Sequence, residues 1–228
     1  MKLNAEFDKR ASMHAAAQDW VPSPMPGVER KMLDRIGEEV ARATSIVRYA
    51  PESAFSEHTH GGGEEFLVLD GTFQDEHGDY PTGTYVRNPP TSHHRPGAKD
   101  GCTILVKLWQ FAPEDRTFVT LDTNGLALEP MMDGQSGVKA ATLFRDDRET
   151  VRIVELAPGA QLDLTPEGGV EILCLEGSFT ESGEEFSHWS WLRLPLGTAL
   201  SLTAGDKGCR LWTKEGHLRF AETATVAA

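Results

Sequence analysis

The sequence is poor in cysteine, in basic residues and in long apolar runs. Its three cysteines, Cys102, Cys174 and Cys209, form no C-x-x-C pair, so neither a disulfide framework nor a thiolate zinc cluster is predicted. Lys and Arg number 22 against 35 Asp and Glu, and the net charge of −13 argues against a nucleic-acid partner. No apolar run approaches the roughly 20 residues that span a bilayer, and the first residues lack the apolar core of a signal peptide. We therefore expect a cytoplasmic protein with reduced thiols and no membrane partner.

The chain does contain a long internal repeat. Four separate landmarks in its first half recur in the second half at an offset of 106 or 107 residues. They are Ala50-Pro51 with Ala157-Pro158, Leu69–Phe73 with Leu175–Phe179, Arg87-Asn88-Pro89 with Arg193-Leu194-Pro195, and Gly101-Cys102 with Gly208-Cys209. Two copies of one unit of about a hundred residues, a usual domain size, are predicted.

Each copy has the pattern of an all-β domain. Short segments rich in β-branched and aromatic residues alternate with turn signals such as Asp70-Gly71 and Pro89-Pro90. The expected strands are 44–49, 65–69, 83–87 and 102–109 in the first copy, and 151–156, 171–175, 189–194 and 210–213 in the second. Evenly spaced short strands predict a sandwich or a small barrel of the jelly-roll kind in each copy.

These signals also suggest domain boundaries. Residues 1–30 are predicted to form an irregular N-terminal arm with one short helix around 11–20. The first barrel is expected at 31–115 and the second at 135–222, with a connector over 111–130.

The segment His58-Thr-His60-Gly-Gly-Gly-Glu64 is the strongest chemical signal. Two histidines at i and i+2 on a strand point to the same face, and Glu64 can return to that face on the next strand, beyond the glycine hinge. His94 follows thirty residues later. Three imidazoles and one carboxylate suit a first-row transition metal.

Two adjacent pairs leave the ligand choice open. Glu65 adjoins Glu64 and His93 adjoins His94, and strand alternation allows only one residue of each pair to face the metal. The spacing favours Glu64 and His94. Their neighbours would then point toward the packing between copies or toward solvent.

The pattern H58-x-H60-x3-E64-x6-G71, followed by G83-x5-P89-x-T91-x2-H94, resembles the two motifs of the cupin superfamily. That resemblance implies two tandem double-stranded β-helix barrels. It implies a metal inside the first barrel, with His58, His60, Glu64 and His94 as its ligands. Thr91 stands where the family pattern usually has Gly, which alters a turn and removes no ligand.

The longer string from His58 to Phe73, together with Asp75 to Pro90, resembles the cupin domain of the ChrR family of anti-sigma factors. Those proteins restrain an extracytoplasmic-function sigma factor in the response to singlet oxygen and organic peroxides. In that family a helical zinc domain with His and C-x-x-C ligands precedes the cupin and grips the sigma factor. This chain contains no C-x-x-C.

The second copy lacks the ligand residues. Alignment of the repeat places Thr165 and Glu167 where His58 and His60 stand. Val170 replaces Glu64 and Leu200 replaces His94, and aliphatic side chains cannot hold a divalent ion. A degenerate, metal-free barrel is expected there, serving as a packing partner or an apolar pocket.

We therefore expect one divalent transition metal per chain, zinc or iron first, with manganese or nickel also compatible. With zinc, four protein ligands close a tetrahedral site of structural or sensory type, and the resemblance then implies a regulatory or stress-sensing protein. With iron, the alternative is a mononuclear dioxygenase acting on a small diketone or phenolic ketone. The partner is a small molecule or a protein, and the chain is a monomer or a homodimer.

Lys107 has its counterpart in Lys214 of the metal-less copy, which favours a structural role over a catalytic one.

Overall fold

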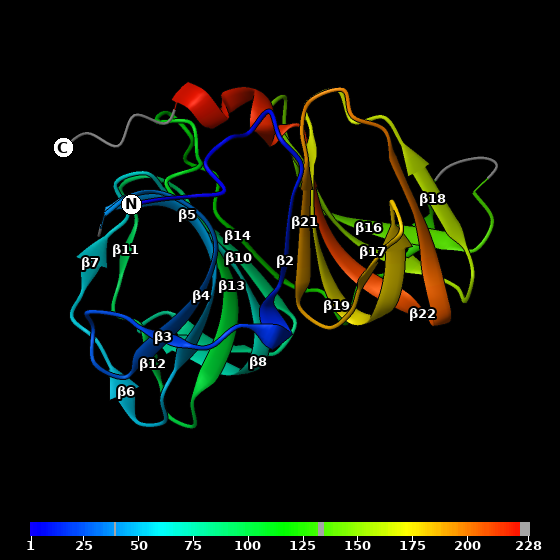
Figure 1. Cartoon of the computed structure of the whole chain (residues 1–228). Helices are drawn as coiled ribbons and strands as arrows, with labels where there is room; N and C mark the ends of the chain where they lie inside the picture. The colour runs from blue at the N-terminus through cyan, green and yellow to red at the C-terminus, as the bar shows by residue number, and fades with distance from the viewer. Residues whose placement is uncertain (39, 132–134, 224–228) are drawn as a thin grey trace. The chain divides into compact units, whose positions relative to one another are not determined.

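The computed structural model describes residues 1–38, 40–131 and 135–223, and nearly all of their regular structure is β-strand (Figure 1). The chain divides into two compact units. The first comprises Met1–Ala5 and Gln18–Asn124, and the second comprises Glu6–Ala17 and Gly125–Thr223. The expected all-β architecture of two barrels is confirmed.

In the first unit, one antiparallel sheet runs in the order β1-β4-β5-β13-β8-β10-β14, and β7 pairs separately with β11. Every strand expected in the first copy is present. The bounds are β1 (Lys2–Leu3), β3 (Val21–Pro22), β4 (Val28–Gly37), β5 (Ala41–Tyr49), β6 (Ser53–Ala54), β7 (His58–Thr59), β8 (Glu64–Asp75), β9 (Gly78–Pro81), β10 (Thr84–Asn88), β11 (His93–His94), β12 (Gly97–Ala98), β13 (Cys102–Leu108) and β14 (Val119–Asp122).

Strand alternation builds the core of this barrel. Along β13, Ile104 and Val106 are buried in the same apolar cluster as Phe66 and Val68 of β8. The alternate residues of β13, such as Lys107, face the other side of the sheet. The interior is therefore apolar except where β7, β8 and β11 bring the predicted metal ligands.

In the second unit, the sheet order is β15-β16-β17-β22-β19-β21-β2, with β18 paired to β22 and β20 to β19. Its core is a larger continuous apolar cluster that includes Val170 and Leu200. The bounds are β2 (Ala11–His14), β15 (Glu129–Pro130), β16 (Val138–Arg145), β17 (Thr150–Leu156), β18 (Gln161–Leu164), β19 (Val170–Glu181), β20 (Glu184–Phe186), β21 (Ser190–Leu194), β22 (Leu200–Glu215), and the 3-10 helices η1 (Ala15–Ala17) and η2 (His217–Thr223).

The segment that precedes the first barrel completes the sheet of the second. Residues 11–14, which lie in the segment expected to form a short helix, are instead the strand β2, and only Ala15–Ala17 make a 3-10 turn. Strand β2 pairs with β21, placing Ala11 opposite Arg193. In the first unit β14 pairs with β10 in the same way, placing Val119 opposite Arg87. Backbone hydrogen bonds to an open sheet edge outweigh the helix propensity of the alanines here.

Both barrels share one β-bulge. In β8 the partners of Thr103 and Ile104 are Asp70 and Val68, so Leu69 is an extra residue in the strand. The second barrel has the same irregularity at Leu175 of β19. A bulge shifts the alternation by one residue, so inward-facing positions change from even to odd numbers along β8.

Among the described residues, no helix is long and apolar enough to cross a membrane.

Candidate metal centre

A glycine hinge joins the two halves of the predicted ligand segment. His58 lies in β7, His60 follows that strand directly, and Glu64 is the first residue of β8. Gly63 has a φ of 77°, in the left-handed region that favours glycine, and a Cβ on Gly62 would overlap the Trp109 ring. The hinge thus returns the chain to the same face of the barrel within three residues.

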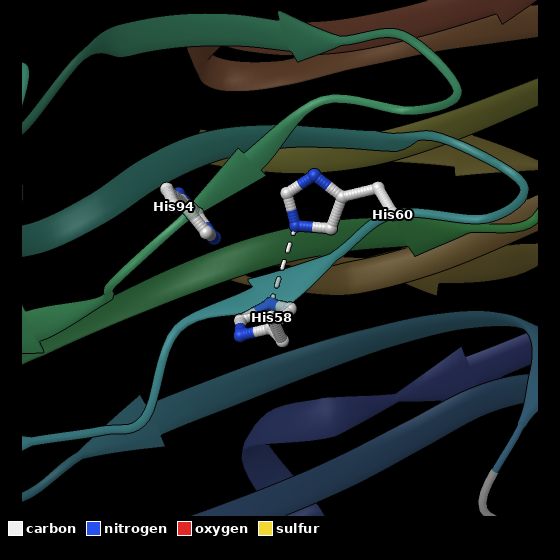
Figure 2. A group of neighbouring side chains, drawn as sticks. All are labelled: His58, His60 and His94. Atoms are coloured by element: carbon white, nitrogen blue, oxygen red, sulfur yellow. Dashed lines mark hydrogen bonds between the residues drawn. The ribbon is translucent and has the colours of Figure 1, made fainter.

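The short pairing of β7 with β11 brings the histidines together. His94 is the direct cross-strand partner of His58. Figure 2 shows the rings of His58, His60 and His94 turned toward one another, and one nitrogen of each lies within 4.8 Å of the others. His60 and His94 are buried, whereas His58 is exposed, so the cluster opens to solvent on the His58 side.

Glu64 adds a carboxylate to this cluster. Its Oε2 lies 3.3 Å from Nε2 of His60 and 3.4 Å from Nε2 of His94, and Asn88 Nδ2 donates to the same oxygen at 3.4 Å. The carboxylate is buried, so it is held beside the imidazoles rather than in water. The structure therefore brings all four predicted ligands to one place.

The neighbours of these ligands point elsewhere. Glu65 is buried on the opposite face of β8 and accepts a hydrogen bond from Tyr85 Oη at 2.6 Å. His93 is exposed and pairs across the strands with Thr59. This geometry favours Glu64 and His94 within the two adjacent pairs.

The hydrogen bonds of two imidazoles fix their tautomers. Nδ1 of His58 lies 3.4 Å from the Ser56 carbonyl, which can only accept. Nδ1 of His60 lies 3.0 Å from Ser92 Oγ, whose own proton goes to the Pro89 carbonyl at 2.6 Å. Both histidines therefore donate from Nδ1, which leaves the lone pair on Nε2. Burial lowers the pKa of His60. The charge of Glu64 opposes this shift, and the neighbouring histidines add to it.

The third imidazole is oriented by a carboxylate. Nδ1 of His94 donates to Asp75 Oδ2 at 3.1 Å. Burial alone would raise the pKa of Asp75, but hydrogen bonds from His94, from the His77 amide and from Tyr80 Oη outweigh it and lower that pKa. Burial lowers the pKa of His94, and the bond to Asp75 and the charge of Glu64 more than compensate, so it is raised. An ionised Asp75 thus keeps the Nε2 lone pair of His94 on the cluster side.

The cluster fits a bound cation. Nε2 of His58 and Nε2 of His60 lie 3.2 Å apart (Figure 2), although both carry lone pairs in the tautomers above. Nε2 of His94 is buried and has no hydrogen-bond partner among the described residues. Convergent lone pairs are unfavourable unless a metal ion or a proton lies between them. A divalent metal is the occupant that satisfies all three at once.

Asp75 and Ser92 are functional residues that spacing did not reveal. Asp75 lies eleven residues after Glu64, and simple alternation would place it on the opposite face of the strand. The bulge at Leu69 returns it to the ligand face. Only the acidic residue and glycine that recur in both copies, Asp70-Gly71 and Glu176-Gly177, hint at this irregularity in the sequence.

The contact between Asp75 and His94 has a measurable consequence. We expect Asp75→Asn to weaken metal binding by about 10–100-fold, because a neutral amide is a poorer acceptor for the Nδ1 proton of His94. Competition with a chromophoric chelator measures this affinity. Asp79→Asn is the matched control, since Asp79 is exposed on the same hairpin and contacts Gln74 instead. Equal affinities of the two variants would contradict the orienting role of Asp75.

The remaining predicted positions lie away from this centre. Lys107 is buried on the outer face of β13 and donates to Thr44 Oγ1 at 2.8 Å. All three cysteines are free and buried, and burial raises the pKa of each thiol to about 12, which makes them poor nucleophiles. In the second barrel Val170 and Leu200 belong to the apolar core.

Comparison with known proteins agrees with this geometry. The family model of the ChrR cupin-like domain matches residues 8–112, a range that contains the whole histidine cluster. Among solved structures, a cupin 2 conserved barrel domain protein from Leptotrichia buccalis superposes on most of the chain (TM-score 0.60, 10% identity, 90% of this chain and 95% of that one). The chain has the fold of two cupin barrels. Its first barrel resembles the ChrR cupin domain.

Two further structures share the fold of this cupin. One is a proposed dioxygenase from Nostoc punctiforme, with a TM-score of 0.72 and 14% identity over 96% of this chain and 83% of that one. The other is the bacterial pirin YhhW from Escherichia coli in complex with nickel(II), with a TM-score of 0.64 and 14% identity over 91% and 98% of the two chains. At these identities the likeness concerns the fold alone. No curated protein sequence matches the chain.

Proposed function

We propose that this cupin holds one divalent transition metal in its first barrel through His58, His60, Glu64 and His94, and that the centre has a regulatory or stress-sensing role. The observation that carries the metal site is the convergence of three Nε2 lone pairs, one of which is buried and has no hydrogen-bond partner in the part of the chain that the structure describes. Four protein donors suit zinc, whose closed tetrahedral sites are structural or sensory. The match to the ChrR cupin-like domain supports the regulatory role.

The chain's own residues set the properties of such a sensor. Asp75 and Ser92 hold the Nδ1 protons of His94 and His60, so both imidazoles present Nε2 to the cluster. His58 is the exposed member of the set. An oxidant or a competing ligand from solution would therefore meet the His58 side first. Loss of that ligand is the trigger we propose, because β7 is only two residues long and, among the described strands, pairs with β11 alone.

A dioxygenase is the second candidate, and a cavity beside the centre favours it. A space of about 420 Å³ is lined by residues that include His94, Asp75, Asn88, Tyr80, Arg116 and Phe118. Its size suits a small organic molecule. Iron would supply redox chemistry and Lewis acidity, while Arg116 would attract the anionic oxygen of an enolised diketone and the exposed Phe118 would contact its apolar part. The fold shared with the proposed dioxygenase of Nostoc punctiforme supports this reading.

Two assays on the metal-loaded protein separate these functions. Oxygen uptake is measured with iron-loaded protein and a panel of β-diketones and phenolic ketones, using His94→Ala as the metal-free control. In parallel, crosslinking and affinity capture with and without peroxide tests for a sigma factor or another protein partner, using His58→Ala as the control. Oxygen uptake that His94→Ala abolishes would establish the enzyme. A partner whose capture depends on His58 and on peroxide, without oxygen uptake, would establish the regulator, and failure of both would reject both roles.

A further inference from the structure

The second barrel contains a cavity at the position where the first barrel has its metal ligands. It measures about 860 Å³, within the range of small-molecule sites. Thr165 and Leu200, the repeat counterparts of His58 and His94, both line it. The metal ligands have been lost here, but an open space remains.

Two residues of opposite charge line this cavity. Arg152 of β17 and Glu215 of β22 line it and form an ion pair through Nη1 and Oε1. Their repeat counterparts in the first barrel are Ser45 and Leu108, neither of which carries a charge. Packing of the fold alone therefore does not require an ion pair at this place.

The cavity has more guanidinium donors than its own carboxylate can satisfy. Among the described residues, Arg152 donates only to Glu215, and Arg145 donates only to Thr150 Oγ1 at a long 3.4 Å. Both guanidinium groups act electrostatically on Glu215, whose pKa burial nevertheless raises. Arg152 and Arg145 therefore keep guanidinium N–H groups that no described residue accepts, and a ligand carboxylate can accept them.

A buried hydroxyl lies on the same wall. Thr213 precedes Glu215 by two residues in β22, so its side chain has the same orientation on the strand. It is buried, and its Oγ1 has no hydrogen-bond partner among the residues that the structure describes. Its hydroxyl adds a buried polar group to the side of β22 that carries Glu215.

The rest of the lining limits the ligand. Leu164, Leu200 and Ala140 also line the cavity and give it an apolar surface. The exposed carboxylates of Glu129 and Asp163 also line the cavity and disfavour a ligand with a second negative charge.

We infer that the second barrel binds a small organic monocarboxylate, with its carboxylate on Arg152 and Arg145 and its apolar body against Leu164 and Leu200. Guanidinium and carboxylate groups form charge-assisted, often paired hydrogen bonds. The site is separate from the histidine cluster, and it does not depend on the function proposed for that cluster.

Titration of the full chain with hexanoate and benzoate tests this site. Calorimetry gives the affinity, and the methyl resonances of Leu164 and Leu200 report the location. Binding is expected to fall at least about tenfold in the double variant Arg152→Gln/Glu215→Gln, which removes both charges and keeps polar groups of similar size. It should be unchanged in His58→Ala, which excludes a carboxylate bound to the metal centre. Should the double variant fail to fold, Arg145→Gln, at an exposed position, is expected to weaken binding several-fold.

Three results would overturn the inference. The first is hexanol or benzyl alcohol binding as tightly as the matching carboxylate, since the guanidinium groups would then have no role. The second is unchanged hexanoate affinity in the charge-removing variants. The third is no shift of the Leu164 and Leu200 methyl groups at concentrations on the order of 10 mM, far above the dissociation constant of a specific site.

Discussion

Protein purified anaerobically without added metal should contain about one divalent transition metal ion per chain, and His58→Ala or His94→Ala should remove it. Each variant deletes one of three Nε2 donors that converge within 4.8 Å. Loss of a direct ligand should lower the affinity by more than the roughly 10–100-fold typical of a residue that only orients one. Inductively coupled plasma mass spectrometry gives the stoichiometry and the identity of the metal.

The matched control is His93→Ala, because His93 adjoins His94 but is exposed and faces away from the cluster. It should retain the full metal content. Loss of metal in His93→Ala together with retention in His94→Ala would reverse the choice between these two histidines. A content near two per chain would mean that the second barrel also binds metal, despite Val170 and Leu200 at the ligand positions.

Lys214→Met should lower the free energy of unfolding by about 3–5 kcal/mol. Lys214 Nζ lies 2.8 Å from Glu149 Oε2, and the two side chains are only 1% and 5% exposed. Removing the cation leaves Glu149 charged in a buried environment, and the lost attraction far exceeds the small gain in apolar packing. Urea denaturation followed by tryptophan fluorescence measures the change.

Lys9→Met is the control within the same unit. Lys9 pairs with Glu6, but both side chains are more than half exposed, so its loss should leave the denaturation midpoint unchanged. A Lys214→Met variant as stable as wild type would show that this buried lysine is not structural. A functional role for the lysine that recurs in both barrels would then have to be reconsidered.

The local pattern of residues was sufficient to predict the strands and the ligand cluster. Alternation and turn residues located β5, β8, β10 and β13, because a half-buried strand has a period of two whatever its neighbours are. His58 and His60 were identified for the same reason, and Glu64 and His94 by their spacing in the motifs that resemble those of the cupin superfamily. Their meeting in space depends on one hinge and one two-residue strand pairing, both of which leave signals in the sequence.

The N-terminal segment could not be predicted correctly in this way. Alanines at 15–17 and a preceding polar stretch favour a helix by propensity, yet Ala11–His14 form a strand on β21. The deciding factor is an open sheet edge almost two hundred residues away along the chain. Local propensity is weak beside several backbone hydrogen bonds made at such an edge.

The sequence by itself determined the repeat, the all-β class, the residues able to bind a metal and the absence of those residues from the second copy. Each of these follows from residue type at a fixed spacing. Only the tertiary structure decided which carboxylate orients His94, because the bulge at Leu69 reverses the alternation before Asp75. It also decided what replaces the metal site in the second barrel. Arg152 and Glu215 are sixty-three residues apart, and only the pairing of β17 with β22 brings them together inside a cavity.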